Sequence, residues 1–417
     1  MDVIIIGAGA AGLMAAIRAA REGAKVLVLE HLDQPGKKIL ATGNGRCNFT
    51  NKIMGTEYFE CSDPSFVTKI LTSFSQKDAI NFFASIGVLE KEKNGCIYPY
   101  SEQSLSIRNA LWNECYRLGV MIRCKEQIKQ IKQIKQENIF SIHTAKQEYT
   151  SKSLIIACGL LAGANLGSDG SAFQYVEQFG HSMIDVVPGL VQMKSEQSIF
   201  SKLAGIRSEI NLKLCVDGQE IYSDNGELQL TKYGISGIVV FQASLKAVKP
   251  LRNGHLVEVL IDFLPEFSIE QVNERLVKQF QNQSYLCHKD KLTGFLNDKL
   301  AAAFLQEIGI VPESKKAISE KLVLKLAQMI KQFTVKISGT KGYEDCQVCL
   351  GGVSIQELNA ETLMSKKQQN LFFAGEIIDV VGQCGGYNLQ WAWSSGAVAG
   401  KAAAMITKEK DDKNQSN

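Results

Sequence analysis

The sequence predicts an α/β fold in which the two ends of the chain build one domain and the middle of the chain is inserted into it. Near the start, an apolar run of strand length, residues 3–6, leads directly into the glycine-rich segment 7–12. Near the end, a second apolar run, residues 371–374, is followed by the acid Glu376 and then by Gly385 and Gly386. Glycines and acids that follow buried strands are typical of the ligand-binding edge of a parallel sheet, so we expect both ends to meet at one ligand.

The first glycine segment has the spacing of a dinucleotide-binding turn. Gly7 allows the tight turn after the strand, Gly9 lets the backbone approach a pyrophosphate, and Gly12 lets the following helix pack closely on the strand. We expect that helix over about residues 10–21, ending before Gly23, which suits a left-handed C-cap. Its first amide groups would face the phosphates.

A second predicted strand, residues 25–29, ends at Glu30. An acid at this position binds ribose hydroxyl groups and repels a 2′-phosphate, which disfavours NADP. An isolated GxGxxG motif is weak evidence, because glycine turns also occur in other α/β proteins. Here strand, glycines, helix, strand and acid follow one another within about 30 residues, which favours a bound dinucleotide.

Residues 35–51 form a basic, glycine-rich segment that follows Glu30, and we expect it to be a loop at the same sheet edge. Lys38 and Arg46 could neutralise phosphates there. The alternative is a solvated loop, and the position directly after the second strand favours the binding role.

The carboxyl-terminal block returns to nucleotide chemistry. Glu376 could bind ribityl or ribose hydroxyl groups, and a helix over about residues 387–406 would point its amino end into the same site. Such a helix end stabilises the negative charge that develops on a reduced flavin ring. Packing of an Ala-rich helix on a sheet would not explain the segment 385–388. The two ends together favour FAD over a freely exchanging nicotinamide.

The middle of the chain changes character from about residue 190. Short strand-like segments alternate with turns as far as Pro265, which predicts an antiparallel β unit. Apolar residues then recur at helical spacing from Val272 to Phe333, which predicts a small helical bundle. We therefore expect a discontinuous FAD-binding domain at 1–190 and 345–407, an inserted substrate domain at 191–344 with a β part at 191–265 and 334–344 and a helical part at 266–333, and a disordered tail at 408–417.

The composition of the chain indicates which classes of binding partner to expect. A net charge of only +3 gives no strong field for nucleic acid, so we expect a small-molecule substrate and no nucleic-acid partner. No segment resembles a targeting signal, and no apolar run reaches the ~18 residues that span a bilayer. These features predict a soluble, cytoplasmic protein without a membrane partner, and they leave its oligomeric state open.

The eleven cysteines are odd in number and scattered, which is typical of reduced thiols rather than a disulfide framework. Cys346 and Cys349 have CxxC spacing, but residues three apart on a strand point to opposite faces. The five histidines are dispersed, and we expect no metal site. No second glycine motif follows a strand, so NAD(P)H would act as a transient electron donor without a domain of its own.

Four segments, at residues 36–51, 233–237, 351–354 and 374–396, together resemble the bacterial YhiN/BaiN-type family of NAD(P)/FAD-dependent oxidoreductases. The resemblance spans nearly the whole chain. It implies a glutathione-reductase-like FAD-binding Rossmann domain with an inserted β-barrel-like and helical domain. Activities in the family include reduction of conjugated double bonds in oxidised bile acids and oxidation of small amino ketones.

We therefore expect an FAD-dependent oxidoreductase that transfers hydride through flavin N5. Its substrate would be an unsaturated small organic molecule, with a sterol or bile acid as the model. The alternatives are an amine or amino ketone oxidase using O₂, and a flavin-binding RNA-modification or scaffold protein. Tyr233 and Tyr387 are the candidate catalytic residues, as proton donors, because each adjoins a glycine motif; either could instead only pack. The cofactor-binding residues expected are Gly7, Gly9, Gly12, Glu30, Lys38, Arg46, Asn48, Gly375, Glu376, Gly386, Asn388 and Gln390.

Overall fold

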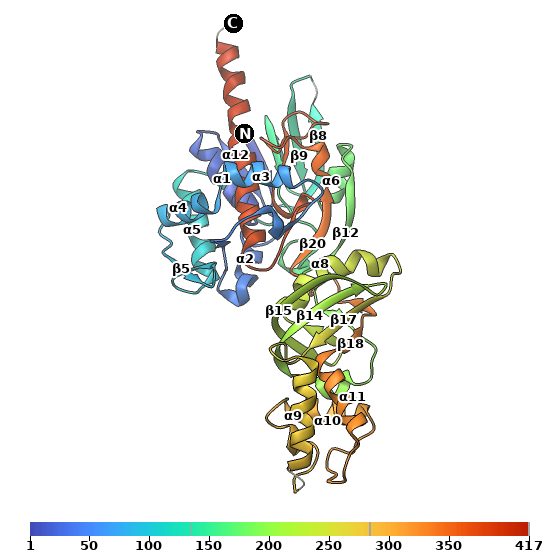
Figure 1. Ribbon diagram of the computed structural model, residues 1–417. Helices are drawn as coiled ribbons and strands as arrows, with labels where there is room; N and C mark the ends of the chain where they lie inside the picture. Colours follow the sequence, from blue (N-terminus) through green and yellow to red (C-terminus); the bar gives the residue numbers. More distant parts are fainter. Residues whose placement is uncertain (135, 283–284, 416–417) are drawn as a thin grey trace. The chain divides into compact units, whose positions relative to one another are not determined.

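A computed structural model describes residues 1–134, 136–282 and 285–415 of the chain, with side chains as far as Thr407 (Figure 1). The chain divides into two compact units. Unit 1 comprises Met1–Val187 and Gln347–Asn417, and unit 2 comprises Pro188–Cys346. The sequence placed the corresponding domain boundaries at 190/191 and 344/345.

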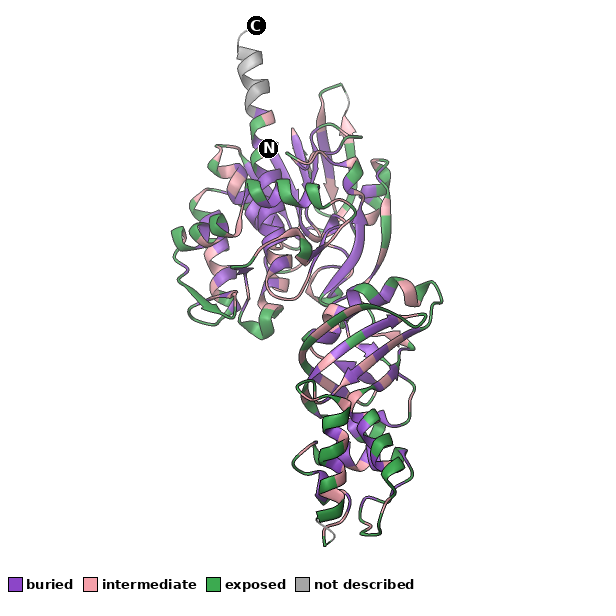
Figure 2. Ribbon diagram, in the orientation of Figure 1, coloured by how far each residue is buried: buried purple, intermediate pink, exposed green. Residues whose placement is uncertain are grey.

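Unit 1 is built on a five-stranded parallel sheet with the order β21-β11-β1-β2-β7. The central strands are continuous apolar runs, because both faces of the sheet are covered (Figure 2). Strands from the two ends of the chain, β1 and β21, thus belong to one sheet. The bounds are β1 Val3–Ile6, β2 Val26–Leu29, β7 Met121–Arg123, β11 Ser153–Ile156 and β21 Leu371–Phe373.

Two helices from opposite ends of the chain, α1 (Ala10–Arg21) and α12 (Tyr387–Gln415), pack against each other. A Cβ atom at Gly396 would collide with the carbonyl oxygen of Ala11, and one at Gly400 with that of Ala15. Glycine therefore sets how closely the two helices approach. Helix α12 is assigned to Gln415, whereas the sequence predicted a helix to about residue 406 and a disordered tail at 408–417; residues 416 and 417 of that tail lie outside the described residues.

The other elements of unit 1 surround this layer. Helix α3 begins at Pro64 after the N-cap Asp63, and α4 begins after the capping box of Ser75 and Asp78. The segment 35–51, expected to be a loop, instead contains α2, η1 and β3. The remaining bounds are α2 Lys37–Ala41, η1 Thr42–Gly45, β3 Thr50–Asn51, η2 Thr56–Tyr58, β4 Phe59–Glu60, α3 Pro64–Ser73, α4 Gln76–Ser85, β5 Glu90–Lys93, β6 Cys96–Pro99, α5 Ser104–Arg117, β8 Ile128–Ile134, β9 Ile139–Thr144, β10 Glu148–Ser151, η3 Ala164–Leu166, α6 Phe173–Gln178, β12 Met183–Gly189, β20 Val348–Val353, η5 Ile355–Glu357, η6 Gly375–Ile377 and β22 Val381–Gly382.

Unit 2 contains a seven-stranded antiparallel sheet with the order β18-β17-β14-β15-β16-β13-β19, and its helices share one apolar core with it. Helix α8 was not predicted, and it lies within residues 191–265, which the sequence assigned to the β part. Val239 and Val240, near its start, are β-branched and buried. Phe333, predicted to be helical, is the first residue of β18. The bounds are β13 Met193–Lys194, α7 Phe200–Leu203, β14 Arg207–Val216, β15 Gln219–Thr231, β16 Gly234–Ser236, α8 Ile238–Arg252, β17 Val257–Asp262, α9 Ile269–Asn282, η4 Asp290–Leu292, α10 Asp298–Glu307, α11 Glu320–Lys331, β18 Phe333–Lys336 and β19 Gly339–Thr340.

Candidate cofactor site

The glycine turn after β1 is set by backbone contacts. Gly7 has φ +97°, and a Cβ atom there would lie 2.6 Å from the carbonyl oxygen of Ala157. A Cβ atom at Gly12 would overlap the carbonyl oxygen of Gly7. At Gly9, by contrast, a Cβ atom would meet no atom within 4 Å, and α1 begins there without a side-chain cap. Gly7 and Gly12 thus serve the turn, while the backbone at Gly9 and the start of α1 can be approached by a ligand.

Glu30 lies at the end of β2, next to this turn. Its carboxylate is almost fully buried and accepts hydrogen bonds from the Ala8 amide, 2.8 Å to Oε2, and from the Leu32 amide, 2.9 Å to Oε1. These bonds fix an acid beside the glycine turn, at the place where the sequence expects a ribose-binding carboxylate. The segment that follows is held to the same turn, since the Gly36 amide donates to the carbonyl of Ala8 over 2.8 Å.

Lys38 and Glu376, 338 positions apart in the chain, form an ion pair with 2.6 Å between Nζ and Oε2. The other carboxylate oxygen of Glu376 accepts a bond from the amide of Cys349 over 3.0 Å. A Cβ atom at Gly159 would lie 3.5 Å from Glu376 Oε2. This edge of the sheet therefore joins α2, β20, η6 and the loop after β11. From the sequence, we expected the Lys38 ammonium to neutralise a phosphate. In the structure it forms an ion pair with a carboxylate of the protein itself.

Gly375 ties η6 to α12. Its amide donates to Ser395 Oγ over 2.9 Å, and its carbonyl accepts from Trp391 Nε1 over 3.1 Å. Gly375 has φ +79°, a conformation that favours glycine, and a Cβ atom there would press on Ala11 at the start of α1. The beginnings of α1, η6 and α12 are therefore held close together.

The amino end of α12 is a tight backbone contact. Gly386 has φ +94°, and a Cβ atom there would lie 2.8 Å from the carbonyl oxygen of Thr50 and 2.9 Å from Asn48 Oδ1. Asn48 Oδ1 is buried and has no hydrogen-bond partner among the residues described. Because a buried acceptor without a partner is costly, it is the kind of group that a bound polar ligand satisfies.

Asn388 and Gln390, both expected to bind the cofactor, use their side chains within the protein. Asn388 accepts from the Gly382 amide over 2.8 Å and donates to the Gly382 carbonyl over 2.6 Å. Gln390 is fully buried; its amide group donates to the Phe74 carbonyl and to Ser394, and it accepts from Thr50. These contacts hold β22, α3 and β3 around the start of α12.

The segment around Arg46 has an unusual backbone. Gly43, Asn44, Gly45 and Cys47 all have positive φ, between 53° and 83°, and two of them are not glycine. Such backbone strain is concentrated at functional sites, and the sequence gave no sign of it. The Arg46 guanidinium is exposed and lies 5.7 Å from the centre of the Tyr98 ring. Within the described residues, the Arg46 guanidinium forms no ion pair with a carboxylate within 4 Å, so its charge is available to a ligand.

The thiols near this site are neutral. Burial raises the pKa of Cys47 to about 12, although a hydrogen bond with Thr42 opposes the shift. Burial likewise raises the pKa of Cys384 to about 12. A nucleophilic thiolate needs the opposite shift, so neither side chain is prepared for covalent chemistry. All eleven cysteines are free thiols. Among the described residues, no group of three or more His, Cys, Asp and Glu side chains is arranged to hold a metal ion.

The two candidate proton donors belong to different units. In unit 1, Tyr387 is buried, with its ring stacked on Tyr58 at 4.6 Å and edge-on to Phe59. Burial, and then the neighbouring Tyr58, raise the pKa of Tyr387, so its phenol stays protonated. In unit 2, Tyr233 is only partly buried, and the Lys341 ammonium lies 4.6 Å from the centre of its ring.

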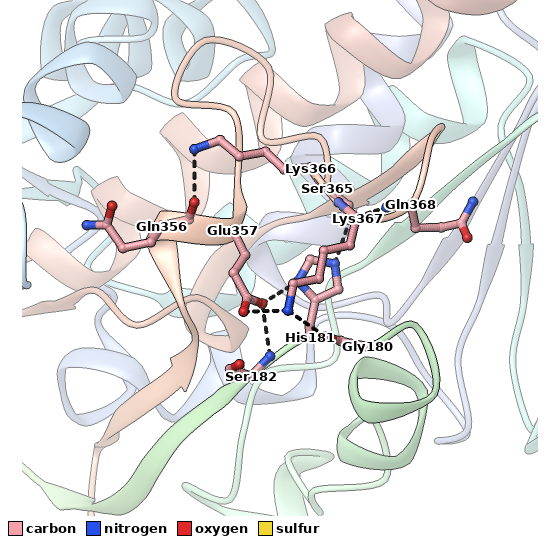
Figure 3. Close-up of polar contacts among 9 residues, drawn as sticks. All are labelled: Gly180, His181, Ser182, Gln356, Glu357, Ser365, Lys366, Lys367 and Gln368. Atoms are coloured by element: carbon pink, nitrogen blue, oxygen red, sulfur yellow. Dashed lines mark hydrogen bonds and ion pairs between the residues drawn. The ribbon is translucent and has the colours of Figure 1, made fainter.

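A buried polar cluster beside the sheet was missed by the sequence analysis, because its members are far apart in the chain (Figure 3). His181 Nδ1 lies 3.0 Å from Glu357 Oε2, and His181 Nε2 lies 2.6 Å from Ser365 Oγ. Lys367 forms an ion pair with Glu357 at 2.6 Å. The His181 ring also packs edge-on against Phe373 of β21. The cluster thus ties the start of β12 and the segment 357–367 to the sheet.

The order Ser–His–Glu is that of a hydrolase triad, but the environment is structural. The His181 side chain is fully buried, and Ser365 Oγ accepts bonds from the amides of Lys367 and Gln368. Burial lowers the pKa of His181. Burial acts to raise the pKa of Glu357, but bonds from Lys367 and Ser182 outweigh it and hold that pKa at about 2. A neutral imidazole therefore bridges a hydroxyl and a carboxylate.

Comparison with known proteins assigns the family. A family model described as the HI0933-like protein Rossmann domain matches residues 1–402. The chain belongs to the HI0933-like family. A member from Clostridium scindens, named 3-dehydro-bile acid delta(4,6)-reductase, is 40% identical over 407 residues, which covers 96% of this chain and 98% of that protein. Two proteins named ribosomal RNA dihydrouridine synthase, from Escherichia coli and Haemophilus influenzae, are 31% and 33% identical; each comparison covers 94% of this chain and 96% of the relative.

Among solved structures, the chain is similar to a 3-ketosteroid-delta4-(5alpha)-dehydrogenase from Rhodococcus jostii RHA1. The TM-score is 0.50 at 14% identity, over 97% of this chain and 96% of that one, which shows a shared fold. The predicted YhiN/BaiN-type flavoprotein family, the FAD-binding Rossmann fold class and the assignment as a flavin-dependent oxidoreductase are confirmed for this HI0933-like protein. No helix in the described part of the chain is long and apolar enough to cross a membrane.

Proposed function

We propose that this HI0933-like protein is a reductase of a carbon–carbon double bond conjugated to a carbonyl group, in a small ring compound of the oxidised sterol or bile-acid class. The observation that carries the proposal is the 40% identity, over nearly the full length of both chains, with a protein named for that chemistry. FAD, when bound, would supply hydride from its N5 atom.

The same bond type occurs in the second set of relatives. A dihydrouridine synthase adds hydrogen across a uracil double bond that is also conjugated to a carbonyl. The common element is hydride addition to the carbon β to a carbonyl, with a proton delivered to the α carbon. The reaction class therefore has wider support than either substrate.

We propose roles for the chain's residues on the basis of their geometry. The amide groups at the start of α1 and the open backbone at Gly9 would bind a pyrophosphate, and Glu30 would bind ribose. The ion pair of Lys38 and Glu376 would shape the edge next to it. Asn48 would donate or accept a bond at the ligand, beside the amino end of α12. The set proposed to build the cofactor site is Gly7, Gly9, Gly12, Glu30, Lys38, Arg46, Asn48, Gly375, Glu376, Gly386, Asn388 and Gln390, in which Asn388 and Gln390 position the segments around the start of α12.

For the proton donor we favour Tyr233 over Tyr387. Tyr233 is partly exposed and lies under a lysine ammonium, whereas Tyr387 is enclosed by two aromatic rings. Tyr233→Phe should reduce kcat without changing the flavin spectrum. Equal rates for the Tyr233→Phe variant and the wild type would remove Tyr233 from this role.

The testing experiment is an anaerobic titration of the FAD-loaded protein with NADH and then NADPH, which we propose as transient donors. Bleaching of the oxidised flavin band at about 450 nm, followed by its return on addition of a 3-oxo-4,6-diene steroid, is the expected result. The saturated 3-oxo steroid should not restore the band. A flavin that no steroid reoxidises, with peroxide formed from an amino ketone and O₂, would instead establish the oxidase.

Ribosomal RNA is the second candidate substrate, favoured by the names of the two relatives at 31% and 33% identity. The reduced protein would be incubated with ribosomal RNA lacking dihydrouridine, and the nucleosides would be analysed by mass spectrometry. If dihydrouridine forms and the steroid is not reduced, the substrate is ribosomal RNA and not a small ring compound. We also propose a cytoplasmic location, because eleven scattered cysteines suit a reducing compartment.

A further inference from the structure

The helical part of unit 2 contains a cavity of about 260 Å³. It lies between the end of α9, the η4 segment and the chain that leads into α11. Its lining combines apolar side chains of α9, of α11 and of the segment before α11 with four charged residues. None of the lining residues belongs to the proposed cofactor-binding set.

Lys291 is the central feature of this cavity. It is only 3% exposed, yet its ammonium has no carboxylate within 4 Å among the described residues. Its contacts are a hydrogen bond to the carbonyl of Phe280 over 3.2 Å and the face of the Phe280 ring at 5.2 Å. A buried charge without a counter-charge is costly, so its retention calls for an anionic partner.

His288 adds to the unsatisfied polarity at this place. It is 2% exposed, its ring lies 5.6 Å from that of Phe280, and its Nδ1 has no hydrogen-bond partner in the described chain. Burial and then the charge of Lys291 lower the pKa of His288. His288 therefore offers Lys291 no negative charge.

The rim of the cavity is also positive. Lys315 and Lys316 are exposed at its mouth. Helix α11, whose N-cap Ser319 makes no side-chain cap bond, begins there with unsatisfied amide groups. Glu320 is the single acid among the lining residues, and it forms no ion pair within 4 Å in the part of the chain that is described.

Four apolar side chains, Val277, Phe280, Ile318 and Val323, also line the cavity. We propose that this cavity binds a small amphipathic carboxylate, with its carboxylate at Lys291 and its apolar body against these four side chains. The wall chemistry and the depth of Lys291 favour such a ligand over an RNA phosphate, because a phosphodiester chain has no apolar body and would reach only the exposed lysines.

The test is calorimetric titration of the full-length, FAD-loaded protein with sodium octanoate, octanamide, inorganic phosphate and a 12-nucleotide RNA. Octanoate should bind, and octanamide and phosphate should bind at least about tenfold more weakly, since each lacks one half of the recognition. Lys291→Met should weaken octanoate binding by about tenfold or more. Lys325→Met removes the same charge from an exposed site on α11 outside the cavity and should leave the Kd unchanged.

The flavin absorbance is recorded in each titration. An unchanged spectrum places octanoate away from the flavin, so this test is separate from that of the proposed function; a spectral change that tracks binding contradicts the proposal. Phosphate binding as tight as octanoate, or an octanoate Kd unaffected by Lys291→Met, also overturns it. If Lys291→Met does not fold, the variant with both Lys315→Gln and Lys316→Gln should weaken octanoate severalfold. A third outcome is that the wild type binds the RNA but not octanoate, and that the double variant loses RNA binding. In that case the cavity rim contacts RNA and the proposal is wrong.

Discussion

The candidate cofactor site of unit 1 contains a partly buried lysine and the cavity of unit 2 contains a fully buried one, and the two differ in how their charge is balanced. Lys38 pairs with Glu376 at 2.6 Å, and that carboxylate is held in turn by the amide of Cys349. Lys291 has a carbonyl and an aromatic face and no acid within 4 Å among the described residues. A balanced pair fixes the shape of a site, whereas an unbalanced charge attracts a ligand of opposite sign.

The same contrast holds within unit 1. Asn388 and Gln390 use their side chains to hold the chain around α12, whereas Asn48 keeps a buried acceptor without a partner in the described residues. Groups that are satisfied within the protein position the site, and groups left unsatisfied are the ones available to a ligand. The predictions below test this distinction.

The largest effect is expected where glycine is required by the fold. Gly12→Ala places a methyl group onto the carbonyl of Gly7 and should destabilise unit 1 by about 3 kcal/mol or more. Gly9→Ala meets no atom within 4 Å and should cost below about 1 kcal/mol. Urea unfolding of the apo protein measures both.

Cofactor affinity separates the two glycines further. Gly9→Ala should fold normally but bind FAD at least about tenfold more weakly, because the methyl group occupies the approach to the start of α1. Unaltered FAD binding in Gly9→Ala would contradict the proposed pyrophosphate site.

Acid should weaken unit 1 through the cluster of Figure 3. The pKa of His181 is lowered in the folded protein by burial, so its contribution to stability is present above the ordinary histidine range and is lost as the pH falls below it. The pKa of Glu357 is about 2 against an ordinary 4.5, so its contribution of at most about 3 kcal/mol is lost as the pH falls from 4.5 towards 2. Both groups act in the same direction.

The measurement is the free energy of unfolding as a function of pH. His181→Gln should flatten the curve below pH ~6.5, and Glu357→Gln should flatten it below pH ~4.5. His143→Gln, on the β9 strand outside the cluster, is the matched control and should keep the slope of the wild type. Parallel curves for all three variants would show that the cluster does not couple stability to pH.

The two lysines allow a direct comparison. Lys38→Met leaves Glu376 without its counter-charge and should destabilise by about 1–2 kcal/mol, between the values for exposed and fully buried pairs. Lys291→Met removes an unpaired buried charge and should leave stability within about 1 kcal/mol of the wild type, or raise it. Equal destabilisation by both substitutions would mean that Lys291 has a counter-charge in solution.

The smallest effect is expected at the unsatisfied acceptor. Asn48→Ala should change apo stability by less than about 1 kcal/mol and weaken FAD binding severalfold, the value of one hydrogen bond. For Asn388→Ala we expect the larger effect on apo stability and the smaller effect on FAD binding, since the substitution breaks two hydrogen bonds to Gly382. Thermal unfolding with and without FAD distinguishes the two patterns.

The features that could be predicted from the sequence are those set by residues close together in the chain. The strand, glycine turn, helix and second strand at the start of the chain follow from neighbouring residues and were confirmed. Helix α8 was missed because its first residues are β-branched and favour a strand locally, whereas in the fold Val239 and Val240 are buried in the helix that packs on the sheet. The cluster of His181 was missed because its partners are about 180 positions away.

The sequence by itself determined the α/β class, the two glycine-rich ends and the family, because glycine turns, helix caps and apolar periodicity act within a few residues. Only the tertiary structure decided that Lys38 forms an ion pair with Glu376 and that the Gln390 side chain hydrogen-bonds within the protein. It also decided that Lys291 is buried without a carboxylate within 4 Å among the described residues. The physical reason is that pairing and burial depend on which distant segments the sheet order and helix packing bring together. Residue type fixes what a side chain can bind, and its neighbours in space fix what remains for it to bind.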